Sequence, residues 1–453
     1  MVRKSKSPLN LVKMNGIKIQ VIAGLRSFLA SSASKKETYF SKITDFSRNG
    51  KLGLPQTAVC CLFLLKKSLN LELDDFFDTL GKSESCCTPS AFSQARYKLK
   101  PVFFQDWQEG MSQNFLELSR QSGTLQTWHG LQVHALDGTT AYLFNKGDIG
   151  DTFGYHSNQH GVQIPMAEIV VRYDVLNKIA IAGQIGGIKE SEKVMAYDLL
   201  AHAHPSTVSL YDRHFHSFAF MYAHQSRHLP FVMRGRCSEG WLKSFLKTGL
   251  SAQIVTICAK DSDIKQAKKN FDYDLPEKAT LTLRLVRVEL DSGEIEVLIT
   301  NLLDEEAYPS AEFKALYALR WREETYFDVL KNKLQLEVFS GQCAHAIKQE
   351  FYALLLVSSL QAILCPKQED LKPINDRRTQ HYAVNQSFSL GILKKFIPLL
   401  LLKDNTPKII RRFEDKCIKH LEPIRPNRKY QRTKHKQRLT GKFKTFNNFK
   451  RAV

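Results

Sequence analysis

Three carboxylates stand where oxygen ligands for metal ions are needed in phosphoryl-transfer sites. Asp137 ends the apolar, β-branched run 131–136, and Asp212 ends a second such run, 208–211, whereas Glu324 lies in a segment with helical spacing. Carboxylate oxygens are the ligands that Mg2+ prefers, and a pair of such ions can activate a nucleophile and stabilise a leaving oxygen. The residues therefore predict a two-metal site for phosphodiester chemistry, with Mg2+ as the cofactor and Mn2+ as a possible substitute.

The residues around Glu324 form a polar helical face. The segment reads Tyr317-x2-Arg320-x3-Glu324-x6-Lys331. At about 100° per residue, these four side chains share a wedge of roughly 60° on a helix. Such a face is poorly suited to a core, but Arg and Lys make charge-assisted hydrogen bonds to phosphate oxygens. The spacing therefore predicts a surface that faces phosphate.

Each of these signals has a simpler interpretation when it is taken alone. Asp137-Gly138 is a favourable turn pair, and Arg320 with Glu324 is a common i,i+4 ion pair of solvated helices. Histidines offer a different metal site, since zinc could use their spacing, although no C-x-x-C pair accompanies them. These histidine pairs are His156 and His160, His202 and His204, and His214 and His216.

Bulk properties indicate a multidomain protein with a polyanionic partner. A chain of 453 residues exceeds the usual size of one core, and its net charge of +20 favours nucleic acid over a neutral partner. Nine cysteines without a zinc-type pair fit a reduced compartment. The N-terminus lacks the apolar stretch of a signal peptide, and the longest apolar run, 351–365, is too short to span a bilayer. We expect a cytoplasmic, nucleoid-associated protein without membrane contact.

Residues 1–127 are predicted to be a helical DNA-binding region. Apolar segments of helical length occur at 56–67 and 71–80, and a third helix begins at Thr88-Pro89, which provide an N-cap and a favourable first helical residue. Three short helices of this kind could form a helix-turn-helix-like DNA reader. The cations proposed to contact DNA are Arg96, Lys98 and Lys100. A plain helical domain with a solvated basic face is the alternative.

The middle of the chain has the element order of a ribonuclease-H-like core. A meander of three strands precedes alternating helices and strands, an order that predicts an α/β (α+β) fold. The predicted strands are 133–137, 167–175, 178–185, 207–212 and 231–234, with helices at 190–201 and 217–227. Further strands at 253–259, 280–289 and 294–302 predict a β-rich insertion, with a hairpin turn at Asp291-Ser-Gly.

The remaining segments complete a prediction of five regions. A helix is expected from 310 to 336, a further apolar helix from 344 to 364, and one more apolar segment at 390–402. The regions are the helical N-terminal region (1–127), the first half of the core (128–236), the insertion (237–309), the second half of the core with the glutamate helix (310–365), and the C-terminal helical region and tail (366–453).

A basic tail closes the chain. From Arg425 onward no Asp or Glu occurs, and phenylalanines are interleaved among the later cations. Such a tail could be solvated, but release of counterions from DNA favours contact with phosphates. The cations proposed to contact DNA are Arg428, Lys429, Arg432, Lys434 and Lys436.

Taken together, these motifs make the chain resemble a DDE transposase of the bacterial insertion-sequence-four type, the group with the Y-R-E-K signature. The resemblance covers residues 88–331. The matching motifs are Asp137-Gly138-Thr139, Asp212-Arg213-His214-Phe215, the strand end Ile299-Thr-Asn301-Leu-Leu-Asp304, the Tyr317/Arg320/Glu324/Lys331 set, and Thr88-Pro-Ser-Ala-Phe-Ser-Gln-Ala-Arg96.

The resemblance implies roles for individual residues. Asp137, Asp212 and Glu324 would bind the catalytic metals, and the residues expected to contact phosphates near the cut are Tyr317, Arg320, Lys331 and Arg213. It also implies an enzyme that binds the terminal inverted repeats of an insertion sequence, cleaves its ends and joins the 3′-hydroxyls to double-stranded target DNA as a homodimer. A ribonuclease-H-like nuclease that does not join strands, and a non-catalytic DNA-binding protein derived from a transposase, are the alternatives.

Overall fold

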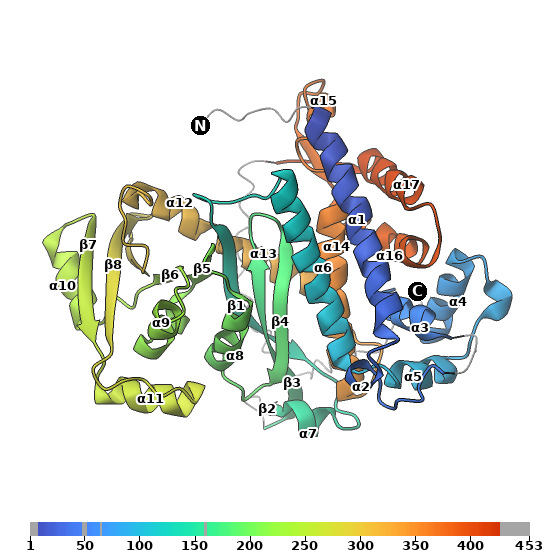
Figure 1. Cartoon of the computed structure of the whole chain (residues 1–453), viewed down its shortest axis with the longest axis horizontal. Helices are drawn as coiled ribbons and strands as arrows, with labels where there is room; N and C mark the ends of the chain where they lie inside the picture. The colour runs from blue at the N-terminus through green and yellow to red at the C-terminus, as the bar shows by residue number, and fades with distance from the viewer. Residues whose placement is uncertain (1–7, 48–51, 64–65, 158–160, 426–453) are drawn as a thin grey trace. The chain divides into compact units, whose positions relative to one another are not determined.

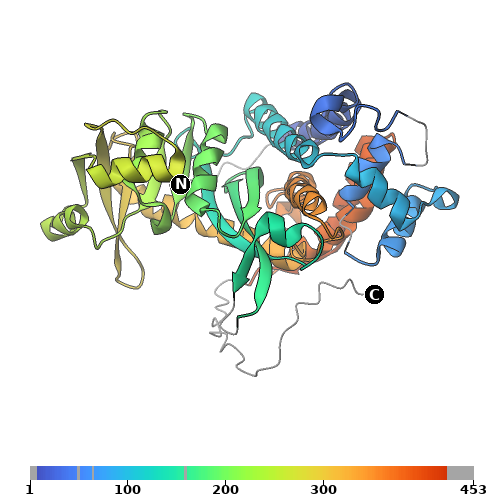
Figure 2. The ribbon, with the colours of Figure 1, turned by 90° about the horizontal axis from the view of Figure 1, so that it is seen from below.

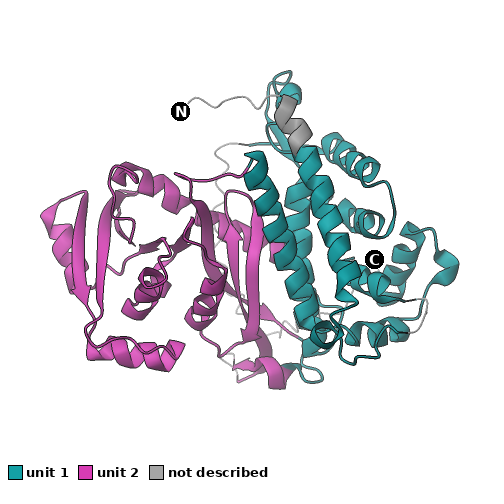
Figure 3. Cartoon of the chain, viewed as in Figure 1, with its two compact units in different colours: residues 1–124, 144–149, 332–453 teal, residues 125–143, 150–331 magenta. Residues whose placement is uncertain are grey.

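The chain divides into two compact units in the computed structural model. The structure describes residues 8–47, 52–63, 66–157 and 161–425. Unit 1 comprises residues 1–124, 144–149 and 332–453, and unit 2 comprises residues 125–143 and 150–331 (Figure 3). Unit 1 thus joins the predicted N-terminal and C-terminal regions, which are far apart in sequence.

Unit 2 is a mixed α/β unit built on one sheet of nine strands. The order is β4-β3-β1-β5-β6-β9-β8-β7, and β2 pairs with the start of β3. β1, β5 and β6 are parallel, whereas every other pair is antiparallel. The strands are β1 (Gln132–Tyr142), β2 (Tyr155–Ser157), β3 (Gln163–Asp174), β4 (Ile179–Gly187), β5 (Thr207–Tyr211), β6 (Phe231–Arg234), β7 (Ala252–Cys258), β8 (Thr280–Glu289) and β9 (Ile295–Thr300).

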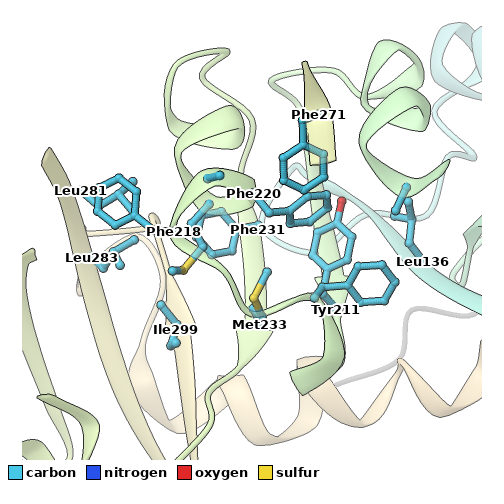
Figure 4. Close-up of a cluster of buried hydrophobic side chains, with 14 of the residues drawn as sticks. Leu136, Tyr211, Phe218, Phe220, Phe231, Met233, Phe271, Leu281, Leu283 and Ile299 are labelled. Atoms are coloured by element: carbon cyan, nitrogen blue, oxygen red, sulfur yellow. The ribbon is translucent and has the colours of Figure 1, made fainter. Parts of the chain in front are cut away.

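An aromatic core holds four helices against this sheet. Tyr211 of β5 and Phe220 of α9 have ring centroids 5.1 Å apart, and Phe220 is 6.2 Å from Phe271 of α11 (Figure 4). Burial of such rings removes a large apolar area from water, which stabilises the pairing of helices and strands. The helices are α8 (Glu192–Asp198), α9 (Phe218–Gln225), α10 (Gly240–Thr248) and α11 (Asp261–Phe271), and all four contribute to the same cluster.

Two further helices of unit 2, α12 (Phe313–Ala318) and α13 (Trp321–Asp328), pack on its sheet. Tyr326 of α13 stacks on Tyr173 of β3, with centroids 4.2 Å apart. The buried Arg284 of β8 fixes the segment before α12, because its guanidinium donates to the Tyr308 carbonyl (2.8 Å) and lies 5.3 Å from the Phe313 ring. The helical run that carries Glu324 is therefore anchored to the sheet at both ends.

Unit 1 is helical and centres on α14 (Ala344–Leu364), which lies beside α6 (Pro101–Ser122) (Figure 1, Figure 2). Nearly every side chain of α14 is buried, as is typical of a helix at the centre of a bundle. The other elements are α1 (Pro8–Ser32), α2 (Lys36–Tyr39), α3 (Leu54–Cys61), α4 (Leu69–Thr79), α5 (Pro89–Tyr97), α15 (Lys372–Asn375), α16 (Gln386–Leu402), α17 (Thr406–Lys419), β10 (Tyr382–Val384) and β11 (Leu421–Pro423).

The predicted strands and most predicted helices are present, but β1 continues to Tyr142, so Asp137 lies within this strand and not at its end as predicted. The helix expected over 310–336 is not one regular helix: a 3-10 turn (Ser310–Glu312), α12 and α13 follow one another, and a π-helical turn (Val329–Lys333) ends the run. The insertion contains α10 and α11 besides its strands, and no separate helix was predicted for α1 or α6. None of the helices in the described residues has both the length and the apolar character needed to cross a bilayer.

Candidate active site

The sheet register brings the two aspartates side by side. Ala135 of β1 pairs with Leu210 of β5 in the parallel ladder, and two residues further along each strand stand Asp137 and Asp212. Neighbouring strands are about 4.8 Å apart, so the register places both carboxylates at the same end of this pair. β5 ends at Tyr211, whereas β1 continues alone against β3. The site therefore lies where two parallel strands separate.

Local hydrogen bonds orient both carboxylates. The Gly138 N–H donates to Asp137 Oδ1 (3.0 Å), and the His214 N–H donates to Asp212 Oδ1 (2.6 Å). Asp212 thereby caps the short 3-10 helix Arg213–Phe215. The second oxygen of each carboxylate is not used by these backbone bonds.

Arg320 connects Asp137 with Glu324. Its Nη1 lies 3.6 Å from Asp137 Oδ2, and its Nη2 donates to Glu324 Oε1 at 3.1 Å. The Arg320 side chain is only 9% exposed, compared with 22% for Asp137 and 35% for Glu324. A guanidinium thus stands between two of the three predicted metal ligands, where it supplies positive charge.

Burial and crowded negative charge set the acidity of Asp137. Burial raises the pKa of Asp137 to about 6, Arg320 opposes the rise, and the charges of Asp212 and Glu324 add to it. Opposite charges within a few ångströms favour the ionised form of a carboxyl, and like charges disfavour it. The charges of Asp212 and Glu324 therefore act on Asp137, and additional positive charge would stabilise its ionised form.

The structure places the other signature residues on the same helical run, with different exposures. Tyr317 is buried, and its hydroxyl donates to the Tyr211 carbonyl (3.2 Å) directly before Asp212. Lys331 is half-buried in the π-helical turn and donates to the Thr140 carbonyl (2.8 Å) on β1. Arg213, next to Asp212, is exposed. In this conformation Tyr317 and Lys331 tie the glutamate helix to the strands that carry the aspartates.

The oxygen ligands suit a hard divalent cation, although they do not form a complete coordination site in this conformation. Asp137, Asp212 and Glu324 offer only oxygen ligands, which Mg2+ prefers over the nitrogen and sulfur ligands typical of zinc. Within the described residues, no three His, Cys, Asp or Glu side chains stand close enough together to hold a metal ion. Arg320 occupies the space between two of the carboxylates. The carboxylates fit Mg2+ by their chemistry.

The cations proposed to contact DNA in unit 1 have different surroundings. Arg96 is buried, because its guanidinium pairs with Glu350 (3.1 Å) and donates to Gln349 (2.8 Å) of α14, so it contributes to packing and not to an exposed basic face. Lys98 lies over the Phe46 ring (5.4 Å), and Lys100 donates to the Glu37 carbonyl (2.7 Å). The tail cations Arg428, Lys429, Arg432, Lys434 and Lys436 lie outside the described residues.

Three further acidic residues surround the site, and sequence reasoning missed them. Burial raises the pKa of Glu192 on α8 to about 7, and the charges of Asp137 and Asp212 contribute to the rise. Burial also raises the pKa of Glu168 on β3, which Lys331 opposes. Glu323 is fully buried and its pKa is well above the ordinary range, again mainly through burial. Glu323 directly precedes Glu324, so an acidic pair on the helix was a usable signal.

An aspartate within β1, an aspartate directly after β5, and a glutamate on a helix that packs on the same sheet match the order of acidic residues predicted for a DDE transferase. Residues 128–360, just over half of the chain, match the model of the family described as the transposase DDE domain. The chain belongs to this family.

Individual relatives are more distant. The chain is 24% identical over 288 residues to the transposase InsG for insertion sequence element IS4 of Escherichia coli (strain K12). This match spans 60% of the chain and 60% of the length of that relative. Among solved structures, a piggyBac transposase synaptic complex with hairpin DNA, determined by cryo-EM, aligns at 11% identity and a TM-score of 0.38, covering 87% of this chain and 80% of the other.

Proposed function

We propose that this protein is a DNA transposase that cuts the ends of an insertion sequence and joins the 3′-hydroxyls to target DNA. The observation that carries the proposal is the parallel register that sets Asp137 beside Asp212, with Glu324 facing Asp137 across Arg320. Membership of the transposase DDE family supports it. This membership also favours double-stranded DNA, both element ends and target, as the substrate.

The catalytic core is proposed to be ribonuclease-H-like. The order β4-β3-β1-β5-β6, with an antiparallel meander followed by two parallel strands, supports this assignment. β9, β8 and β7 extend the same sheet beyond β6, so the predicted insertion adds to the core sheet instead of forming a separate layer. The glutamate helix follows this extension in sequence and packs back on β1 and β3.

Each residue of the site has a distinct proposed role. Asp137, Asp212 and Glu324 would hold Mg2+ or Mn2+, and such ions activate the attacking oxygen and stabilise the leaving oxygen when they are bound. Arg320 and Lys331 are proposed to transfer from their present oxygen partners to phosphate oxygens of the DNA end, since both side chains form charge-assisted bonds that phosphate can replace. Arg213 is exposed and would contact phosphate directly.

Further segments of the chain are proposed to hold the DNA. The helical N-terminal region would recognise the terminal repeats, with Lys98 and Lys100 as candidate contacts, and the basic tail from Arg425 onward would follow the phosphate backbone. A homodimer is proposed because two element ends must be held together during joining. The net charge of +20 supports a large electrostatic contribution to binding.

Cleavage and strand transfer with labelled DNA test the proposal. The purified protein with Mg2+ and terminal-repeat DNA is expected to cut the ends and to join them to a plasmid. Glu324→Gln is expected to slow cleavage by about 10³-fold or more, because loss of a metal ligand removes several kcal/mol of transition-state stabilisation. End binding by the same variant should be nearly unchanged in a gel-shift assay.

A matched control and the alternative outcomes complete this experiment. Asp328→Asn changes an exposed acid one turn further along α13 and should leave cleavage intact. Cleavage without joined products would identify a nuclease, and binding without cleavage would identify a DNA-binding protein. Equal loss of binding and cleavage in Glu324→Gln would remove the basis for assigning Glu324 as a metal ligand.

A further inference from the structure

The last helix of unit 1, α17, has an apolar face that fixes it to neighbouring helices (Figure 1). The Phe413 ring lies 5.5 Å from the Phe396 ring of α16, and Glu414 forms an ion pair with Lys18 of α1. The other buried side chains of α17 are Thr406, Ile409, Ile410 and Cys417. The packing of these side chains sets the direction of the opposite face, which plays no part in holding the helix.

The opposite face of α17 is basic and exposed to solvent. At about 100° per residue, its cations fall within an arc of about 140°, and the buried side chains occupy a separate arc of about 100°. The first and last of these cations are about 16 Å apart along the helix axis, at a rise of about 1.5 Å per residue. The cations of this basic face are Lys408, Arg411, Arg412, Lys416 and Lys419.

Little negative charge compensates the basic face. Asp415 is the one exposed acid of α17, and none of the cations of this face forms an ion pair with another described residue. The parts of the chain outside the described residues contain no Asp or Glu that could supply the missing charge. By contrast, Lys268 on the exposed side of α11 pairs with Asp272 (2.9 Å) and Asp274 (3.2 Å). The positive charge of the basic face is therefore available to a partner.

The stability of the helix itself does not explain this arrangement. The helix dipole favours Lys416 and Lys419 in the last turn, but it disfavours Lys408 in the first turn, where α17 has no acid. Arg412 stands four residues from both Lys408 and Lys416, and like charges at this spacing destabilise a helix. Local rules of this kind are broken at functional sites, where the residues serve a partner.

The basic face matches one strand of a DNA duplex in length and in chemistry. Phosphates follow one strand at about 3.4 Å per step along the duplex axis, so about 16 Å of helix spans about five of them. α17 exposes no amide or hydroxyl side chain, although such groups commonly read base edges in the grooves. Lys and Arg bind phosphate oxygens, and these contacts position a protein without reading base sequence.

We infer that the basic face of α17 binds the phosphate backbone of double-stranded DNA without regard to base sequence. The inference rests on the proposed function, because it adds a DNA-binding surface to the transposase proposed there. Only β11 separates α17 from the basic tail that begins at Arg425, so one stretch of the chain would carry both contacts.

Removing cations from the basic face of the full-length chain tests the inference. Binding of Arg411→Gln/Arg412→Gln/Lys416→Gln to a duplex of random sequence is measured by fluorescence anisotropy over a series of salt concentrations. Glutamine keeps the helix propensity and removes the charge. The slope of the logarithm of the binding constant against the logarithm of the salt concentration should become shallower by about 0.9 for each lost phosphate contact, up to about 2.7. The affinity at about 0.1 M salt should fall about 100-fold or more.

Lys265→Gln/Lys268→Gln/Lys269→Gln is the matched control, because it removes the same charge from the exposed side of α11, where the cations stand among acids. Its slope and affinity should stay close to those of the wild type. Equal changes in the two triple variants would reduce the effect to net charge and overturn the inference, as would unchanged binding in the α17 variant. The urea unfolding midpoint of the α17 variant should equal that of the wild type, since the apolar face is retained.

Adding a cation to the basic face gives an effect that damage to the fold cannot produce. Asp415→Lys should tighten duplex binding and steepen the slope by about 0.9, because one more phosphate is neutralised. Glu277→Lys makes the same change of charge at an exposed position between α11 and β8, and it should leave the slope unchanged. Weaker or unchanged binding in Asp415→Lys would contradict the inference.

Other nucleic acids and the reaction itself distinguish the remaining outcomes. Duplexes of random sequence and of the terminal repeat should show the same change of slope. A change confined to the terminal repeat, or one larger for single-stranded DNA or RNA, would overturn the inference. Cleavage at saturating DNA should be unchanged in the α17 triple variant, because none of the proposed site residues lies on α17.

The inference and the proposed function can fail separately. If the wild type cuts and joins DNA while the α17 triple variant binds like the α11 control, only the inference fails. If the wild type neither cuts nor joins DNA, the proposed function fails, whereas the salt slopes still decide whether α17 binds duplex DNA.

Discussion

Replacing Arg320 with methionine should raise the pKa of Asp137 and shift the pH range of the proposed metal binding. In the structure the Asp137 pKa is raised by burial to about 6, and Arg320 is the group that most strongly opposes the rise. Removing an opposite charge at this range typically raises a carboxyl pKa by about 1–3 units, which places Asp137 in the variant near 7–9. Methionine keeps the length and apolar stem of the side chain while removing the charge.

A Coulomb estimate gives a similar magnitude. The Nη1 and Oδ2 atoms are 3.6 Å apart. At an effective dielectric constant of about 20, two unit charges at this distance interact by about 4–5 kcal/mol, and partial solvation of Asp137 lowers that figure. Since one pKa unit corresponds to about 1.4 kcal/mol, a rise of 1–3 units requires about 1.4–4 kcal/mol. The two approaches therefore agree.

Calorimetric titration of Mn2+ between pH 5 and pH 9.5 measures the effect. The metal binds the ionised carboxylate, so affinity falls as pH drops through the pKa of Asp137: near 6 in wild type and near 7–9 in Arg320→Met. At the highest pH the variant should bind Mn2+ at least as tightly as wild type, because the guanidinium no longer competes for Asp137 and Glu324. The two affinity curves should therefore cross.

Lys314→Met is the matched control for this experiment. Lys314 lies on α12 of the same helical run, but its ammonium pairs with the exposed Asp291 (2.6 Å) and is not among the groups that shift the pKa of Asp137 most. Its affinity curve should keep the wild-type midpoint. If Arg320→Met also kept that midpoint, the electrostatic coupling between Arg320 and Asp137 would be refuted.

Three other predictions concern stability and DNA binding. Burial raises the pKa of Glu109 on α6 from its ordinary value of 4.5 to about 7, so the protein loses stability as the pH rises from 4.5 to 7. Glu109→Gln should therefore leave the free energy of unfolding in urea unchanged at pH 4. At pH 8 it should raise this free energy by about 1–2 kcal/mol, after allowance for partial exposure. Arg284→Met should lower the free energy of unfolding by about 3–5 kcal/mol, because Glu305 and two backbone carbonyls lose a buried cation. Arg287 of the same strand is only half-buried, so Arg287→Met should lower the free energy of unfolding much less. Deleting residues 425–453 should weaken DNA binding. The slope of the logarithm of the binding constant against the logarithm of the salt concentration should become shallower by about 0.9 for each phosphate that the shortened chain no longer neutralises. An unchanged slope would mean that the tail does not contact DNA.

The aspartates could be picked out because their signal is local: an apolar run with a strand period followed by Asp is visible in a short window. Asp212 does follow its strand, whereas β1 continues past Asp137 to Tyr142, because residues 138–142 pair with β3 alone. The same local logic predicted the strands of unit 2 except the short β2. It did not reveal α6, although this helix begins at Pro101 and proline is favoured at the first position of a helix.

Residues whose role depends on tertiary contacts could not be predicted in this way. Arg96 looked like an exposed cation, but its partner Glu350 lies 254 residues away on α14. Glu192 stands in the first turn of α8, where acidic residues are common because the helix dipole stabilises them. Its contact with Gly138 depends on the packing of α8 against β1, which no pattern in the sequence reveals.

The position of Glu324 depends mainly on the strands of the proposed core, with one further anchor from the extension β7–β9. Its helical run is held by Tyr317 on the Tyr211 carbonyl, Lys331 on the Thr140 carbonyl, Arg322 on the Val175 carbonyl, and Tyr326 stacked on Tyr173. These partners belong to β1, β3 and β5 or to the residue directly after β3, and β5 ends directly before Asp212. Arg284 of β8 adds the anchor on the Tyr308 carbonyl. A change in length or sequence elsewhere in the extension would therefore leave the spacing of the three carboxylates intact as long as these contacts remain.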